Sequence, residues 1–175
     1  MQKVSALAFS FALLVGAGCN QDSPAGRPNA TNAPLSLNSL DGVVARHVGI
    51  HVGGRDVQAT VFAKDLGPSA LFVCSYAFST AADGKQEREA AINEEIDRCV
   101  ANSGAQVVSR KTLSVADQPA VEVIAKSPKN KALSIRCRVI CTTNEIHSLT
   151  SITPDNQNAS SVQALDKMFE EFRVK

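Results

Sequence analysis

Apolar positions beyond residue 43 fall into short runs that alternate with polar residues or are rich in β-branched and aromatic side chains. Glycine, proline, asparagine and aspartate separate these runs, and this pattern is typical of strands joined by tight turns. Strands are predicted over residues 43–52, 57–63, 70–78, 106–115, 120–125, 133–142 and 145–152. The connections most typical of hairpin turns are residues 53–54, 67–68, 129–131 and 143–144.

Two segments have the 3.6-residue apolar period of amphipathic helices. In residues 85–103, Ile92, Ile96, Cys99 and Val100 form one stripe, and Gly104 stands where a C-terminal cap belongs. The acids of this segment are expected to form its solvated face: Glu87, Glu89, Glu94, Glu95 and Asp97.

The second helix is predicted over residues 160–172, with Val162, Leu165, Phe169 and Phe172 on its buried side and Met168 at the edge. Ser160 and Gln163 fit a capping box at its start. Strands cluster as hairpins and helices are few, so the fold class is α+β, with a mostly antiparallel sheet flanked by helices. Residues 42–175 suit a single domain.

The first 18 residues read as a targeting segment, because Lys3 precedes an apolar run that is too short to span a bilayer. Residues 15–19, Val-Gly-Ala-Gly-Cys, resemble the lipobox of bacterial lipoproteins, in which the cysteine is lipidated and becomes the first residue. Cys19 is therefore the expected lipidation site, carrying palmitate-type acyl chains. Residues 19–41, rich in proline and small polar residues, read as a flexible tether that holds the domain off the membrane.

The charge balance argues against a nucleic-acid partner. The chain has 18 basic and 17 acidic residues, and removal of the leader takes one lysine away. A mature chain near zero net charge lacks the basic face that phosphate contacts require. The expected membrane contact is the lipid on Cys19, at the cell envelope. Asn20, in place of an aspartate, favours the periplasmic side of an outer membrane if the organism is Gram-negative.

The order of elements resembles the PsbP-like α/β/α sandwich, especially small bacterial lipoproteins of that type. The resemblance covers residues 43–175 and is carried by Phe72-Val73-Cys74-Ser75-Tyr76, the helix at 85–104, Gln118-Pro119-Ala120-Val121-Glu122, Ile135-Arg136-Cys137-Arg138-Val139, Ile146-His147-Ser148-Leu149-Thr150 and Phe169-Glu170-Glu171-Phe172-Arg173. Ala120 replaces the usual glycine, and His147-Ser148-Leu149 replaces the usual Tyr-Gln-Leu. The resemblance implies a non-catalytic binding or assembly role and carries over no active site.

Four cysteines remain beyond Cys19: Cys74, Cys99, Cys137 and Cys141. An even number in an oxidising compartment predicts two disulfides. Cys137 and Cys141 share one strand, where four residues span about 13 Å, so they cannot pair with each other. Each must then pair with Cys74 or Cys99, and a bridge from Cys99 to the strand is one solution. The alternative is four reduced, buried thiols that pack as small apolar groups. No spacing typical of a zinc site occurs, and no metal is expected.

Other titratable residues have ordinary interpretations. His47 and His51 read as half-exposed strand histidines, and His147 receives no role. Arg136 and Arg138, opposite the cysteines, are expected to pair with Glu122 on a solvated face. The alternative is a small anion-binding patch that they form with Lys126 or Lys131.

No nucleophile elbow, phosphate loop or dinucleotide fingerprint occurs, so neither enzymatic activity nor a cofactor is expected. The sequence thus predicts a lipid-anchored envelope domain that binds a protein partner without catalysis. The alternative is a periplasmic module that binds a small molecule or an ion in a cleft between sheet and helix.

Overall fold

A computed structural model describes residues 35–36, 43, 45–77, 84–101, 103–127 and 133–174, with the side chains of 35–36 excepted. The predicted leader, Cys19, the tether before residue 35 and the turn at 129–131 lie outside these residues. The elements are β1 (Leu35–Ser36), β2 (Arg46–Val52), β3 (Arg55–Leu66), β4 (Ser69–Ala77), α2 (Lys85–Ala101), β5 (Gln106–Val115), β6 (Gln118–Lys126), β7 (Leu133–Cys141), β8 (Glu145–Pro154), α3 (Ala159–Glu171) and β9 (Arg173–Val174).

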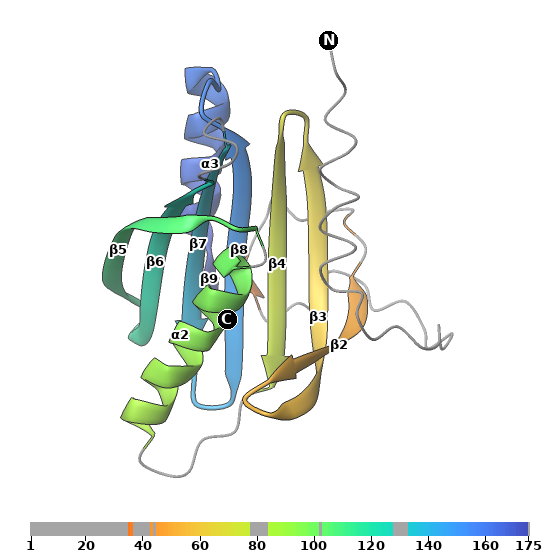
Figure 1. Cartoon of the computed structure of the whole chain (residues 1–175), viewed down its shortest axis with the longest axis vertical. Helices are drawn as coiled ribbons and strands as arrows, with labels where there is room; N and C mark the ends of the chain where they lie inside the picture. Colours follow the sequence, from red (N-terminus) through yellow and green to blue (C-terminus); the bar gives the residue numbers. More distant parts are fainter. Residues whose placement is uncertain are drawn as a thin grey trace.

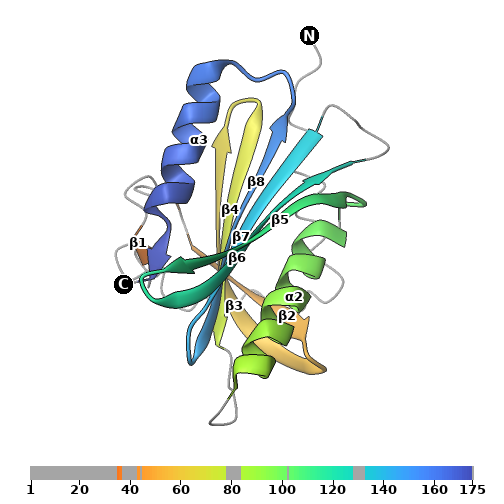
Figure 2. The same ribbon diagram turned by 90° about the vertical axis from the view of Figure 1, so that its left-hand side faces the viewer.

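The main sheet has the strand order β2-β3-β4-β8-β7-β6-β5, and all of its neighbouring pairs are antiparallel. The helices lie on opposite faces, so that the sheet forms the middle layer (Figures 1 and 2). A two-stranded pair of β1 and β9 lies beside it. The predicted α+β class, with an antiparallel sheet flanked by helices, is confirmed.

Alternation along the strands assigns one core to each face of the sheet. On the α2 side, Ile92, Ile96 and Val100 of the helix pack against Val123, Val139 and Ile146. On the α3 side, Leu165, Phe169 and Phe172 pack against Phe62, Leu71 and Leu149. The helix stripes predicted from the 3.6-residue period therefore face the sheet, except at Val162. This residue was expected on the buried side of α3 but is 44% exposed, because it lies in the first turn at the edge of the stripe.

The end of the chain is fixed by Arg–aromatic and ionic contacts as well as by burial. The guanidinium of Arg136 lies 4.2 Å from the ring centroid of Phe169, an attractive cation–π geometry. Arg136 also pairs with Asp166 of the same helix at 2.6 Å, and Arg138 donates to the backbone oxygen of Phe169. Strand β7 thus positions α3 through two side chains that face it.

The start of α3 differs from the prediction. Asn158 is the N-cap, and its side-chain oxygen accepts from the backbone NH of Ser161 at 2.9 Å. Ser160 lies inside the first turn, where its hydroxyl donates to Asn158 Oδ1 at 2.9 Å. The capping box at Ser160 was therefore wrong, because Asn158 is an equally good cap two residues earlier.

Tight turns explain two hairpins. Gly53 and Gly54, both with positive φ, connect β2 to β3 as predicted. The β5–β6 turn was not predicted, because it places Ala116 (φ 49) and Asp117 (φ 63) in the left-handed region without a glycine. Among the described residues, no helix combines the length and the hydropathy needed to cross a bilayer.

Candidate functional site

The four cysteines of the domain are free thiols, and all are buried. The predicted two-disulfide framework is therefore wrong in this structure, and the alternative of reduced, packed thiols describes it. Cys74 on β4, Cys99 on α2, and Cys137 and Cys141 on β7 face the same core, as the strand and helix periods predicted. Facing one core is a weaker condition than the Cα separation and side-chain direction that a bridge requires.

Three of these thiols, Cys74, Cys99 and Cys141, are poor nucleophiles at neutral pH. Burial, with Glu95 nearby, raises the pKa of Cys74 to about 12, and burial raises the pKa of Cys141 to about 11. A hydrogen bond with Cys137, together with burial, raises the pKa of Cys99 well above its ordinary value. Since the thiolate is the reactive form, all three side chains stay protonated and unreactive at neutral pH.

Glu95 is the residue that the sequence interpretation placed wrongly. It was expected on the solvated face of α2, but it is fully buried between the helix and the sheet. Its spacing shows why: Glu95 lies three residues after Ile92 and four before Cys99, at the edge of the apolar stripe. The expectation grouped it with the other acids of the segment by residue type rather than by position.

A complete set of donors surrounds the buried carboxylate. Arg98 donates to it through Nε at 2.8 Å and Nη2 at 2.6 Å. The hydroxyls of Tyr76 and Ser148 donate at 3.1 and 2.5 Å, and the Cys99 thiol donates at 3.4 Å. The carboxylate therefore has partners from α2, β4 and β8.

The electrostatics of this cluster follow from burial and pairing. Burial lowers the pKa of Arg98, but the Glu95 carboxylate more than offsets this, so that the net shift is upward. Burial, and then Glu95, raises the pKa of Tyr76. All the hydrogen-bond donors around Glu95 come from this chain, and they join α2 to the sheet. Neither carboxylate oxygen lacks a donor, so the cluster offers no binding position for a ligand.

The polar face opposite the cysteines is also internally paired. Glu122 accepts from Arg136 at 3.1 Å and from Arg138 at 2.6 Å. Of the two lysines that the anion-patch alternative named, Lys126 pairs with Asp155 at 3.2 Å, and Lys131 lies outside the described residues. The predicted pairing with Glu122 is confirmed, but the face is not solvated, because α3 covers it and leaves the side chains of Arg138 and Glu122 only 11% and 14% exposed.

The histidines lie apart from one another. His47 and His51 are exposed on β2, as predicted, and His51 Nδ1 lies 2.9 Å from Asp56 Oδ1. His147 is fully buried, with Nδ1 3.0 Å from Ser75 Oγ. Its Nε2 lies 3.3 Å from Glu145 Oε2 but forms no hydrogen bond of good geometry. Burial lowers the pKa of His147 to about 4, so it is neutral at neutral pH.

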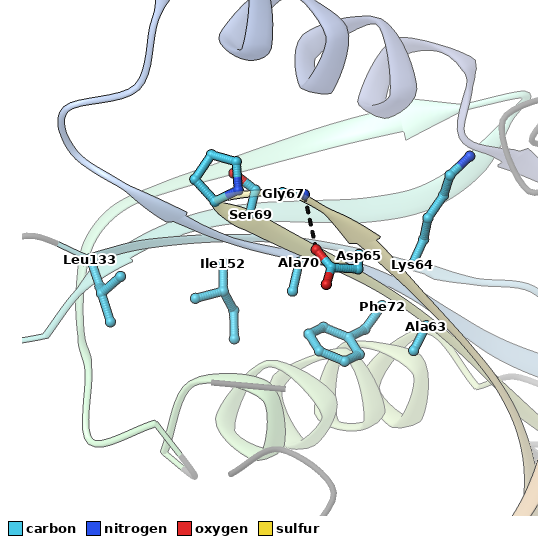
Figure 3. Close-up of a pocket in the computed structure, with 10 residues that line it drawn as sticks. Ala63, Lys64, Asp65, Gly67, Ser69, Ala70, Phe72, Leu133 and Ile152 are labelled. Atoms are coloured by element: carbon cyan, nitrogen blue, oxygen red, sulfur yellow. Dashed lines mark hydrogen bonds between the residues drawn. The ribbon is translucent and has the colours of Figure 1, made fainter. Parts of the chain in front are cut away.

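A small apolar pocket opens beside the β3–β4 hairpin on the α2 side of the sheet. Figure 3 shows Leu133, Ile152 and Phe72 pointing into it from one side of the sheet. Ala63 and Ala70 complete the apolar wall, and the cavity holds about 220 Å³. Polar side chains at its rim come from the hairpin, where Asp65 Oδ1 accepts from the Gly67 NH at 2.9 Å.

A second cleft lies between the β2–β3 hairpin and α2, and it holds about 400 Å³. Val52, Val57 and Ala91 form its apolar part, and Arg55, Glu87 and Glu94 lie around it. Glu94 also accepts from the backbone NH of Gly53 at 2.5 Å and so joins the helix to the hairpin. This is the kind of place, between sheet and helix, that the small-molecule alternative requires.

The layers and the strand order define the class of fold, which is an antiparallel α+β sandwich. Among the described residues, no group of three or more His, Cys, Asp or Glu side chains is arranged to hold a metal ion. No family model matches the chain, and no curated protein matches it.

Among solved structures, the chain is similar to cyanobacterial PsbP (CyanoP) from Synechocystis sp. PCC 6803. The two are 15% identical, with a TM-score of 0.47, and the match covers 87% of this chain and 100% of that one. It is also similar to PA94 from Pseudomonas aeruginosa, a protein of unknown function. There the identity is 12%, the TM-score 0.44, and the coverage 71% of this chain and 94% of that one. These similarities concern the fold alone.

Proposed function

We propose that this protein is a lipid-anchored domain of the cell envelope that binds a protein partner without catalysis. The leader over residues 1–18, the lipobox-like residues before Cys19 and the tether predicted over residues 19–41, of which residues 35–36 pair with β9, support the anchor. Two or more acyl chains on one cysteine are sufficient for stable membrane attachment. In this proposal the tether lets the sandwich meet its partner at a distance from the lipid.

The apolar pocket of Figure 3 is the observation that carries the binding role. Its volume of about 220 Å³ is below the roughly 300–1,000 Å³ of pockets that enclose whole small ligands. It suits one large apolar side chain instead, and such buried anchors contribute most of the energy of many protein interfaces. Asp65 at the rim provides a polar group of the kind that surrounds the apolar centre of an interface.

The second candidate function is small-molecule binding, which the cleft between α2 and the β2–β3 hairpin favours. Its volume of about 400 Å³ falls within the range of ligand sites. Arg55 and Glu94 would orient a ligand that carries both charges. A small molecule that co-purifies with the protein and is lost in Ala91→Phe, but not in a pocket variant, would favour this function.

The anchor is tested by mass spectrometry of the mature N-terminus. We expect a diacylglyceryl-modified Cys19 as the first residue, and the Cys19→Ala variant should lose its membrane attachment. An unmodified N-terminus downstream of residue 19 contradicts the anchor.

The binding role is tested by placing a photo-crosslinking amino acid at Ala63, on the mouth of the pocket, in intact envelopes. We expect a defined crosslinked protein whose captured peptide carries a large apolar residue. The matched control places the same amino acid at Ala159, which is exposed on the opposite face of the sheet. Equal capture from the two positions contradicts the pocket as the contact.

A further inference from the structure

The open edge of the main sheet at β5 is a second feature suited to a protein partner. Strand β5 ends the strand order, and within the described chain it pairs with β6 alone (Figure 1). All of its residues are exposed or half-exposed. Beyond an irregularity between Val107 and Ser109, its register runs without interruption from Ser109 to Val115. The outer backbone groups of this stretch can therefore pair with another strand.

Exposed apolar surface is concentrated at one end of this edge. Val107 and Val108 are 47% and 59% exposed, and the described residues include one other exposed large aliphatic side chain, Val162 on α3. The opposite edge differs, because Val52 of β2 is buried and Val48 and Ile50 pack against the core. The two valines thus give β5 an apolar contact that β2 lacks.

The charge of β5 indicates which partner it favours. The strand carries Arg110 and Lys111 on opposite faces and has no acidic residue. Arg110 donates to the neutral amide of Asn93 at 2.5 Å. Lys111 stands opposite Glu122, but Arg136 and Arg138 already neutralise that carboxylate. Within the described residues, Lys111 has no ion pair.

These charges disfavour a second copy of the chain at the same edge. Two copies of β5 that pair antiparallel about a two-fold axis keep each side chain on its own face, so a pairing centred on Arg110 or on Lys111 places that cation opposite its own copy. Like charges directly opposite each other destabilise a strand pair, whereas opposite charges contribute favourably. An acidic strand meets one cation on each face and gains at both positions.

We propose that the β5 edge binds an extended acidic segment of a protein partner by strand addition, with carboxylates beside Arg110 and Lys111 and an apolar residue near Val108. This inference rests on the proposed function, since it adds a second contact to the same non-catalytic binding role. Backbone pairing supplies affinity in this mode of recognition, and the side chains supply specificity.

The test uses the purified full chain and two fluorescent valine–threonine peptides of eight residues that differ at two adjacent central positions, which are Glu-Glu in the glutamate peptide and Lys-Lys in the lysine peptide; adjacent residues of a strand face opposite sides, as Arg110 and Lys111 do. We expect fluorescence anisotropy to show binding of the glutamate peptide at least about tenfold tighter than that of the lysine peptide, weakening with added salt. Hydrogen exchange should slow at backbone amides within residues 109–115. No binding of the glutamate peptide, equal binding of both peptides, or protection elsewhere overturns the proposal.

Variants separate local charge from net charge. Lys111→Glu should lower the affinity for the glutamate peptide at least about tenfold, and Lys111→Gln should lower it less. Lys85→Glu changes the net charge equally at an exposed position on α2 and should leave binding unchanged. An equal loss in both reversals overturns the proposal. Photo-crosslinking from Ala63 tests the proposed function separately. The peptides carry no large apolar side chain that would fill the pocket, so either experiment can fail without the other.

Discussion

At the scale of single residues, the most consequential side chain is the buried Glu95. A carboxylate removed from water is tolerated only when it is paired and hydrogen-bonded, and here Arg98, Tyr76 and Ser148 supply those bonds. The net stabilisation from such a pair is small, but the loss of one partner is costly because the other stays buried. Glu95 therefore fixes how α2 lies on the sheet.

Glu95→Ala should destabilise the protein by about 1–3 kcal/mol, because the part-buried Arg98 and the hydroxyls of Tyr76 and Ser148 lose their shared acceptor. Denaturant unfolding measures the change, with Glu89→Ala on the exposed face of α2 as the control. Replacing Glu95 and Arg98 together by leucine should cost less than Glu95→Ala alone. Similar unfolding free energies for Glu95→Ala and Glu89→Ala would show that the buried pair does not hold the helix.

His147 should make stability depend on pH. Its pKa falls from an ordinary 6.5 to about 4 in the fold, because burial disfavours the charged ring. Between these values the unfolded chain binds more protons, so the stability is complete above pH 6.5 and declines as the pH falls toward 4. The full decline attributable to this group is on the order of 3 kcal/mol.

The measurement is the unfolding free energy of the protein and of His147→Gln between pH 7.5 and 4.5. The His147→Gln variant should be less stable at neutral pH, because glutamine does not fill the space of the buried imidazole ring. It should lose less stability on acidification, because glutamine takes up no proton in this range. His51→Gln, on an exposed histidine, should keep the original slope. An unchanged slope in His147→Gln contradicts the burial argument.

At the scale of elements, sequence periodicity located the described strands of the main sheet and both described helices. Both patterns arise because the side chains that face a core are apolar. The two cores of this fold contain most of the apolar positions that the strand alternation and the helix stripes marked. The β5–β6 turn was missed because Ala116 is not a turn-forming residue and no glycine or asparagine accompanies Asp117, although both residues have positive φ. The β1–β9 pair was missed because two-residue strands have no period.

Asn158→Ala should cost about 1 kcal/mol by removing the N-cap of α3. The loss arises because the backbone NH of Ser161 no longer has the Asn158 side chain as its acceptor. Thermal or denaturant unfolding measures it, and Asn158→Asp should retain most of the stability since a carboxylate also caps. If Ser160→Ala were the costlier change, the cap would lie where the sequence pattern placed it.

At the scale of the whole molecule, the sequence predicted the class of fold but not the state of the thiols or the pocket. Cys74, Cys99, Cys137 and Cys141 converge on one core as predicted, yet they remain free thiols. The number of cysteines cannot report the separation between them. The pocket is lined by Leu133, Ile152 and Phe72 from three different strands, and no spacing along the sequence predicts that these residues lie together.

The most direct measurement is the affinity of the partner captured from Ala63 for three forms of the protein. Ala63→Leu fills the mouth of the pocket, whereas Ala159→Leu adds the same side chain on the opposite face. The account predicts that Ala63→Leu weakens binding at least about tenfold, a loss of about 1.4 kcal/mol, while Ala159→Leu binds like the unaltered chain. Equal affinities for all three forms would contradict the pocket as the binding site.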